Sequence, residues 1–424
     1  MEPMRMSLSS ACRLSLGLAC AALLVNVAAA QTPSVRPTHA QESSAPAPQS
    51  KSSKRADARS WHASPSFQVN AEYDNNVFLL PATKKADVAS PSAAEVTSGR
   101  YSDMNQAADL LTTVSAGVTV KGPGLMGKSS VIVPELSYEL YTQNTQRSNL
   151  KLGLSLQQEA WANGRFRFQG SLTPSYFARN YLADAIDQDA SGSITADERV
   201  YARGEYGEGE LVADYRLPLS KSTKKQPFGA ALQLGGGYYN RSYNAPLVGR
   251  NLHGPTAGAK VLFDLGRRVE LDVGYDYSSL GARVIDQVLL LDEQDFGQDL
   301  NGNGSNSDVS ARVLTPVDRS RREQSLGATL RLEASKKADL SVRYEYRWRR
   351  YTSEQALDIA DRGRQDSRNQ ISADLRIRVT SDLRARLGGV YSSQSLNRSG
   401  DPGSTGEIDD YTRSQARLGL SYDL

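Results

Sequence analysis

Twelve residues near the middle of the chain have the types and spacing of a calcium-binding loop. In such a loop, oxygen ligands come from positions 1, 3, 5, 7 and 9, and a glutamate at position 12 binds through both of its oxygens. Gly192 stands at position 6, where the chain must turn sharply, and the apolar Ile194 follows at position 8. The ligand positions hold Asp187, Asp189, Ser191, Ser193, Thr195 and Glu198. The spacing therefore predicts a bound Ca²⁺ ion in a structural role.

A second segment repeats part of this pattern about one hundred residues later. Gly304 again stands at position 6, but Ser310 replaces the glutamate at position 12. The matching ligand positions are Asp299, Asn301, Asn303 and Ser305. Loops rich in asparagine and glycine are common without any metal, so the sequence predicts this segment only as a weaker second site.

The first loop resembles the loop of EF-hand proteins, with three departures. No paired second hand is present, and the flanking segments leave room for only about one turn of helix before strand-like sequence begins. Arg199 follows Glu198 at a position that is usually apolar. A solvated acidic loop without metal is the alternative interpretation.

The start of the chain is typical of an export signal. Two arginines precede an apolar run over residues 14–29, and three alanines at 28–30 offer a cleavage site. We therefore expect a signal peptide over residues 1–30, which contains both cysteines of the sequence. The segment 31–64 is rich in Ser, Pro and Ala, a composition that favours a disordered arm.

Beyond residue 64, apolar and polar residues alternate with a period of two, which indicates strands with two unlike faces. The clearest example places Leu340, Val342, Tyr344, Tyr346 and Trp348 on one face. About fourteen such segments are predicted, beginning near Phe67, Asp109, Lys128, Leu150, Arg165, Gly204, Phe228, Thr256, Arg268, Gln324, Asp339, Gln370, Leu383 and Tyr411. Many have the 9–11 residues that a tilted strand needs to cross a bilayer.

The connections between these segments alternate between short and long. Short links such as 162–164 and 336–338 separate long polar ones, including 81–106, 181–202 and 281–322. Short turns at one end and long loops at the other are typical of outer-membrane barrels. The calcium-like loop falls in the long link 181–202, and we therefore expect it on the extracellular side. A soluble all-β protein or a tandem of sandwiches remains the alternative.

The last strand carries a more specific resemblance. Gly419, Tyr422 and the terminal Leu424 resemble the C-terminal signal of bacterial outer-membrane β-barrel proteins, although phenylalanine is the commonest last residue there. The resemblance covers residues 65–424 and implies an all-β, antiparallel transmembrane barrel of about 14 strands in the outer membrane of a Gram-negative bacterium. It also implies contact with outer-membrane lipid and recognition of the last strand by the barrel assembly machinery.

In such a barrel the polar face of each strand lines the lumen. The basic residues predicted to lie there are Arg343, Arg347, Arg376, Arg378, Arg384 and Arg386, and the acidic ones include Glu270 and Asp272. A basic wall facing an acidic wall would tune ion selectivity. The alternative is that these charges pair with one another and line a closed lumen.

The predicted function is therefore a porin-like channel for passage of small polar solutes, anions among them, with extracellular loops ordered by calcium. A surface-interaction or export-assembly barrel with a blocked lumen is the alternative. The formal charge of +3 is small, so no nucleic-acid partner is expected. His253 is the one histidine beyond the arm, and the His-x-Ser-Asn-Gly pattern of barrel phospholipases is missing from the sequence. An enzyme with catalytic residues is therefore not predicted.

Overall fold

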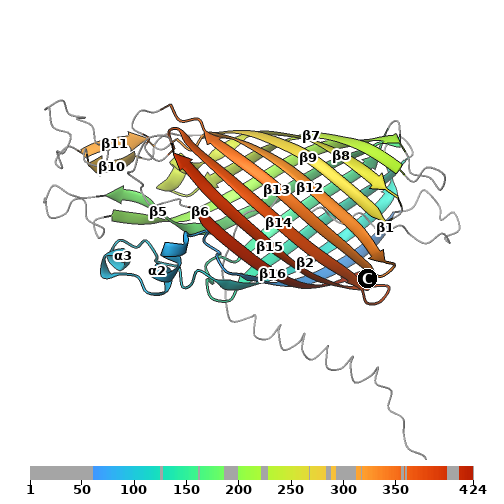
Figure 1. The fold of residues 1–424 in the computed structure, drawn as a ribbon, viewed down its shortest axis with the longest axis horizontal. Helices are drawn as coiled ribbons and strands as arrows, with labels where there is room; N and C mark the ends of the chain where they lie inside the picture. Colours follow the sequence, from blue (N-terminus) through green and yellow to red (C-terminus); the bar gives the residue numbers. More distant parts are fainter. Residues whose placement is uncertain are drawn as a thin grey trace, which may run out of the picture.

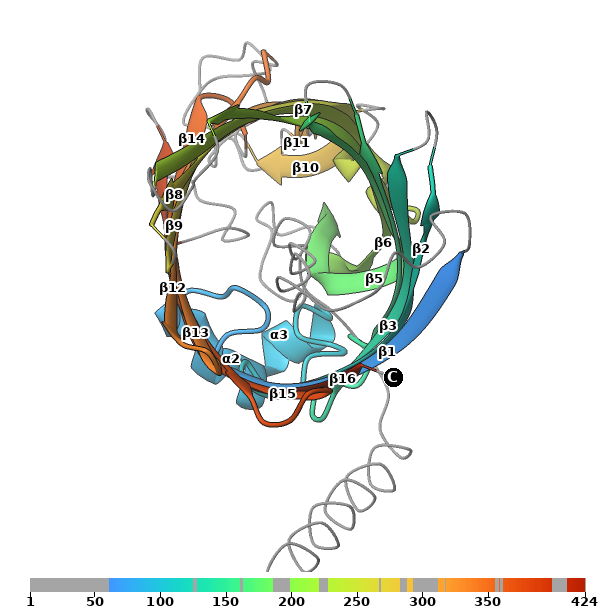
Figure 2. The same cartoon turned by 90° about the vertical axis from the view of Figure 1, so that its right-hand side faces the viewer.

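The fold is a closed β-barrel (Figures 1 and 2). The computed structural model describes residues 61–124, 128–160, 163–185, 199–220, 228–266, 268–282, 288–292, 312–316, 318–354, 358, 361–398 and 410–423. Within these residues, fourteen antiparallel strands form the barrel in the order β1-β16-β15-β14-β13-β12-β9-β8-β7-β6-β5-β4-β3-β2. Each of the fourteen predicted segments corresponds to one of these strands, so the predicted fold class is confirmed.

The strands are long, as a tilted crossing of the bilayer requires. Their bounds are β1 His62–Asp74, β2 Asp109–Pro123, β3 Ser129–Tyr141, β4 Asn149–Glu159, β5 Arg165–Ala185, β6 Arg199–Ser220, β7 Phe228–Tyr243, β8 Leu252–Leu265, β9 Val269–Ala282, β12 Arg321–Ser335, β13 Ala338–Tyr351, β14 Arg364–Arg378, β15 Leu383–Arg398 and β16 Tyr411–Asp423.

Alternate residues of each strand have opposite environments, which is why the period-two pattern predicted them. On β13, Tyr344 points outward and is 46% exposed, whereas the next residue, Glu345, points into the lumen and is 6% exposed. The outer surface carries exposed apolar residues on strands all around the barrel, among them Phe67, Leu136, Leu211, Leu234, Leu326, Leu387 and Leu418. In a bilayer, these side chains contact lipid, and closure of the sheet pairs the backbone of every strand.

The two ends of the barrel differ. One end carries the short connections and the last described residue of the chain, and the other carries several extra elements (Figure 1). These extra elements are η1 Ala82–Lys84, α2 Lys85–Ala89, α3 Ala93–Thr97, η5 Leu247–Arg250, and a hairpin of β10 Val288–Asp292 with β11 Arg312–Pro316. The hairpin lies against β5, which extends with β6 beyond the other strands. Among the described residues, no helix combines the length and the apolar composition needed to cross a membrane.

The first and last strands close the barrel. β1 and β16 pair from Ser66 opposite Asp423 to Asp74 opposite Gln415. Gly419 lies opposite Asn70, and a Cβ atom at this glycine would collide with the amide oxygen of Asn70. The glycine of the C-terminal motif therefore leaves room for a lumen-facing side chain of β1.

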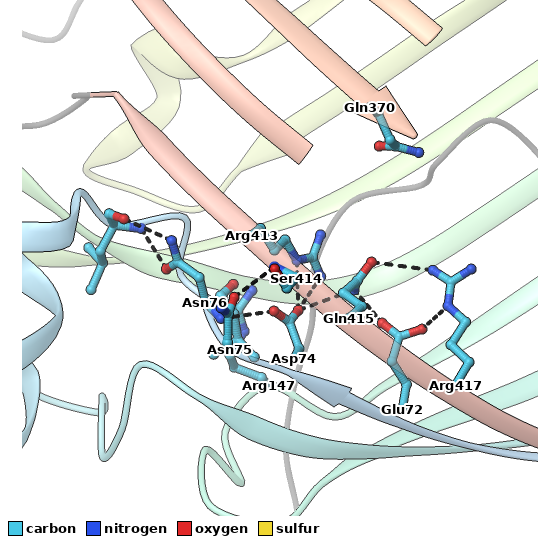
Figure 3. A network of polar contacts seen from close by, with 12 residues as sticks. Glu72, Asp74, Asn75, Asn76, Arg147, Gln370, Arg413, Ser414, Gln415 and Arg417 are labelled. Atoms are coloured by element: carbon cyan, nitrogen blue, oxygen red, sulfur yellow. Dashed lines mark hydrogen bonds and ion pairs between the residues drawn. The ribbon is translucent and has the colours of Figure 1, made fainter. Parts of the chain in front are cut away.

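Lumen-facing side chains also join these two strands (Figure 3). Arg413 donates from Nε to Asp74 Oδ2 at 2.7 Å. Arg417 pairs with Glu72, the preceding lumen-facing residue of β1. Gln415 lies between the two ion pairs and donates to both carboxylates. Two carboxylates of β1 are thus matched by two arginines of β16 across the closing seam.

Candidate functional site: the lumen and its two mouths

All eight predicted lumen residues lie on the inward face of the barrel. They alternate along their strands with outward residues that are exposed to lipid, such as Ile371 on β14 and Leu387 on β15. The strand register then decides which of the eight become neighbours, and this the sequence alone did not reveal. The six arginines belong to β13, β14 and β15, which are adjacent in the wall.

Four of the six arginines form ion pairs. Arg343 and Arg347 share Glu345, with distances of 2.9 and 2.7 Å from guanidinium nitrogen to carboxylate oxygen. Arg386 contacts Asp374 at 2.8 Å, and Arg384 contacts Asp423 of β16 at 2.8 Å. In this part of the wall, four arginines therefore use three carboxylates.

The remaining two arginines, Arg376 and Arg378, form no ion pair among the described residues. Arg376 lies directly opposite Arg386 across β14 and β15, and Arg378 lies directly opposite Arg384. Like charges at directly opposite positions destabilise a sheet. Asp339 is the β13 neighbour of Arg376, yet the two side chains do not form an ion pair. Both unpaired side chains are exposed near the short-turn end of the lumen.

The acidic residues of β9 do not form a wall opposite the arginines, contrary to the arrangement expected from the sequence. β9 is the direct neighbour of β12, and Arg331 of β12 contacts Glu270 at 3.3 Å and Asp272 at 3.1 Å. These two carboxylates thus pair within the basic side of the barrel. Register between adjacent strands, which the residue pattern did not show, brings the opposite charges together.

Sequence reasoning missed a second group of lumen charges on β6. Glu208 accepts hydrogen bonds from Tyr239 Oη at 2.5 Å and from Arg241 Nε at 2.8 Å, and Asp214 pairs with Arg167 at 2.8 Å. The period-two spacing of Glu208, Glu210 and Asp214 was the signal that could have revealed them. Glu210, Asp214 and the partners Arg167, Tyr239 and Arg241 border a lumen cavity of about 270 Å³ that is lined by residues of β5–β9, β12 and β13.

Arg321 and Arg349 belong to the same lumen, nearer to the long-loop end. They share Glu323, with nitrogen–oxygen distances of 2.5 and 3.1 Å. All three side chains are at least partly shielded from solvent, and both arginines are buried. Buried charges without partners are costly, so pairing is expected here.

The loop between β1 and β2, residues 75–108, folds against the inner side of the wall at the long-loop end. Phe78 is 3% exposed and meets Phe177 of β5 edge to face, with ring centroids 6.5 Å apart. Its buried cluster includes Leu111 and Tyr141, which are inward residues of β2 and β3. Because these partners face the lumen, the loop lies inside the mouth and narrows it.

Polar contacts fix this loop at several points. The fully buried Arg147 lies 4.4 Å from the ring centre of Phe78 and donates to the backbone oxygen of Val77 at 2.7 Å. Asn180 of β5 donates to the backbone oxygen of Gly99 at 3.1 Å. Asn76 donates to the backbone oxygen of Thr412 at 2.9 Å. Contacts to β5, β16 and the β3–β4 connection therefore hold one loop in place.

Both predicted calcium segments, 187–198 and 299–310, lie outside the described residues. Among the residues that the structure does describe, there is no group of three or more His, Cys, Asp or Glu side chains that could hold a metal ion. β5 and β6 stay paired up to Ala185 opposite Arg199. The flanks of the first segment are thus strands, as the sequence indicated, where an EF-hand would have helices. Leu424 of the C-terminal motif also lies outside the described part.

His253 is the second residue of β8 and lies on its outward face, next to Tyr238, with ring centroids 6.4 Å apart. It lies opposite Asn240 of β7 and Gly281 of β9. No carboxylate or serine pairs with it through the imidazole among the described residues. The residue is placed on the rim of the barrel and away from the lumen charges.

A closed antiparallel barrel with an apolar outer face and a charged lumen is the architecture of an outer-membrane β-barrel protein. The only sheet that can cross a bilayer is one whose edges are joined, because backbone groups have no water to bind there. The chain is therefore a β-barrel of the outer membrane of a Gram-negative bacterium, as the sequence indicated.

No protein-family model matches the sequence, and no curated protein is similar to it. Several solved structures of outer-membrane proteins do match. A loop-deletion mutant of OmpT, an outer membrane protein of Vibrio cholerae, aligns with a TM-score of 0.38 at 10% identity over 86% of this chain and 99% of its own. The outer membrane channel DcaP of Acinetobacter baumannii aligns with a TM-score of 0.37 at 10% identity, over 87% of this chain and 99% of its own.

An anion-selective porin from Comamonas acidovorans aligns with a TM-score of 0.33 at 8% identity, over 86% of this chain and 99% of its own. Because identities and TM-scores are this low, none of these matches assigns a function to the chain.

Proposed function

We propose that this protein is an outer-membrane channel that passes small polar solutes and favours anions. The observation that carries the proposal is the pair of unpaired, exposed arginines, Arg376 and Arg378, each facing a further arginine across the strand ladder. Arg384 and Arg386 are already ion-paired, so an anion beside Arg376 and Arg378 would compensate the two guanidinium charges that have no carboxylate. Because the groups are exposed, an anion would lose little hydration there and could leave again.

The lumen cavity supports the same proposal. It lies among Lys260, Arg343 and Arg347 as well as the acidic residues of β6 and β9. Because these charges are already paired with one another, they would line a polar path that binds neither anions nor cations strongly. Excess positive charge would then act mainly at the short-turn mouth, where a charge-lined opening raises the local concentration of oppositely charged solutes.

The experiment is the reversal potential of single channels in a planar bilayer under a salt gradient. Arg376→Gln combined with Arg378→Gln should lower the preference for anions by roughly threefold to tenfold, since two unit charges are lost at about 6 Å from the path in water. The control variant Arg376→Lys combined with Arg378→Lys keeps both charges and should keep the preference. Cation preference in the unaltered protein, or no change in the glutamine variant, would contradict the proposal.

A second candidate is a barrel whose lumen is closed at the long-loop mouth and whose outer loops bind a partner. The inward-folded β1–β2 loop favours it, because Phe78 and Arg147 are buried inside the mouth. Phe78→Ala separates the two functions. A channel already open would change only its conductance, whereas a silent barrel would begin to conduct.

We also propose that the segment 187–198 binds Ca²⁺ as a structural ion. The six ligand positions of the sequence support this, and its carboxylates would hold the segment at the end of the β5–β6 extension. Sites in extracellular modules bind at about 10⁻⁴–10⁻³ M, so millimolar calcium would fill it. Calorimetry on the folded protein should show binding that Glu198→Gln abolishes and Asp299→Asn leaves in place. Binding that survives Glu198→Gln would reject the segment as the site.

A further inference from the structure

Two arginines lie on the lipid-facing side of the barrel and do not contribute to the lumen. Arg322 of β12 and Arg350 of β13 are directly opposite each other in the ladder and are both exposed. Cross-strand neighbours of this kind have Cβ atoms about 4.5–5.5 Å apart, and like charges there are destabilising. Among the described residues, neither side chain forms an ion pair or a hydrogen bond.

The neighbours of these two arginines along the strand ladder are polar and uncharged. Ser279 of β9 lies opposite Arg322, Gln365 of β14 lies opposite Arg350, and Asn397 of β15 lies opposite Gln365. Five adjacent strands thus present a row of hydrogen-bond donors with two cations at its centre and no carboxylate. β12, β13 and β14 lie side by side in the wall (Figure 1). Such a row is suited to an oxyanion, and guanidinium groups bind phosphate through paired hydrogen bonds.

The outward surface next to the two arginines, toward the centre of the membrane, indicates which kind of anion fits. Trp348 is two residues before Arg350 on the same outward face, which is about 6.6 Å along the strand. Below it lie the exposed Tyr344, Leu326 and Tyr275. Aromatic residues mark the membrane interface of a barrel, so the arginines lie at headgroup height and the apolar column lies in the hydrocarbon. An occupant needs an anionic head and an apolar body.

The row lies at the long-loop end of β12 and β13, which is the extracellular side of an outer-membrane barrel. Lipid in this leaflet is phosphorylated glycolipid. We propose that Arg322 and Arg350 bind the phosphate of an outer-leaflet glycolipid, whose acyl chains lie on the apolar outer face of β12 and β13. The site is independent of the proposed channel, because its side chains point away from the lumen.

The experiment measures lipid retained by the full mature protein, refolded in detergent free of outer-membrane lipid, by native mass spectrometry. The probe is lipid A with two phosphates, and the matched probes are the same lipid without phosphates and inorganic phosphate alone. The bisphosphorylated lipid should bind, and Arg322→Gln combined with Arg350→Gln should weaken it about tenfold, from the loss of two hydrogen-bonded charges.

Two further variants separate specific binding from general charge. Arg322→Lys combined with Arg350→Lys should retain part of the affinity, since lysine keeps the charge and loses the two-pronged geometry. Lys336→Gln combined with Lys337→Gln removes two exposed charges from the opposite end of the same two strands and should leave binding unchanged. Heat-modifiable migration in gels checks that each variant is folded.

Three outcomes would overturn the proposal. One is an unchanged affinity in the double glutamine variant, and another is equal binding of the lipid without phosphates. The third is equal binding of inorganic phosphate by the same arginines, which would assign the site to a soluble anion. Channel selectivity is measured separately, so failure of the lipid site would leave the proposed channel intact.

Discussion

Arg147 and Arg378 show how differently the two ends of the barrel treat the same side chain. Arg147, near the long-loop mouth, is fully buried and lies against Phe78 and a backbone oxygen. Arg378, near the short-turn mouth, is exposed and faces another arginine. A buried charge must have partners or it costs several kcal/mol, whereas an exposed charge can remain without them. The long-loop mouth is therefore held in one arrangement by buried contacts, whereas the short-turn mouth exposes charge to solutes.

The β13–β14 connection repeats the first pattern. Arg319 and Arg364 both contact Asp361, at 2.9 and 3.2 Å, and Arg364 also pairs with Asp366 at 2.8 Å. All four side chains are buried. Together with the packed β1–β2 loop, this network makes the long-loop mouth a region of interlocked contacts.

Phe78→Ala should have the largest effect, which is loss of packing of the β1–β2 loop in the long-loop mouth. Loss of a buried phenylalanine costs about 3–5 kcal/mol, and here the loss falls on the β1–β2 loop because the strands remain paired. Hydrogen exchange should therefore become faster over residues 76–107 and stay slow in the strands. Val96→Ala in the same loop is the control, since Val96 is 63% exposed and should change stability by less than about 0.5 kcal/mol. Unchanged exchange in Phe78→Ala would mean that the loop does not depend on this contact.

The same substitution at two positions of β14 should have different effects at the two mouths. Asp366→Asn removes a buried partner of Arg364 and should lower the free energy of unfolding by about 2 kcal/mol, since Asp361 still holds that arginine. Asp374→Asn should affect stability less and increase anion preference about threefold, because one negative charge disappears from the short-turn end. Denaturant unfolding and reversal potentials measure the two effects. Equal changes in stability for the two variants would remove the distinction between the mouths.

The smallest effect is expected from the pH dependence of one carboxyl group, Asp358, in the β13–β14 connection. Burial, followed by the charge of Asp361, raises the pKa of Asp358 from 3.8 to about 6. Between about pH 4 and 6 the folded form binds the extra proton, so the stability contributed by this group is present at low pH and is lost as the pH rises through 6.

Hydrogen exchange of the amides of Arg362 and Arg364, which donate to the backbone oxygens of Asp358 and Asp361 at 3.0 and 3.2 Å, should accordingly be slower at pH 5 than at pH 7 after correction for intrinsic rates. Asp358→Asn should remove this dependence. A mouth that becomes less protected on acidification would contradict the sign of the shift.

The strands and their inward faces were predictable because lipid and lumen demand different residues at alternate positions. The pattern on β13 needed no knowledge of other strands, and it placed Arg343 and Arg347 inward. What it could not provide was register. That Arg376 meets Arg386, and that Arg331 reaches Glu270, depends on pairing between strands.

The packed mouth was missed for a different reason. Val77, Phe78 and Met104 stand in a polar segment without periodicity, and the cluster they join includes Phe177, about one hundred residues away. Short helices there follow local signals, such as the capping box of Ser92 and Glu95, which are easily read as loop. Contacts between distant segments, rather than local propensity, decided that structure.

The closing seam has a consequence for how the barrel is made. Asn76 contacts Thr412, a separation of 336 residues along the chain, and every pair between β1 and β16 is comparably distant. Such contacts form slowly, because the entropy of closing a long loop is lost before the contact stabilises anything. The edge of β1 that pairs with β16 therefore stays unpaired until the last strand has been positioned. A folding factor that shields this edge, or that holds the two strands together, would shorten the time during which the unpaired edge can aggregate.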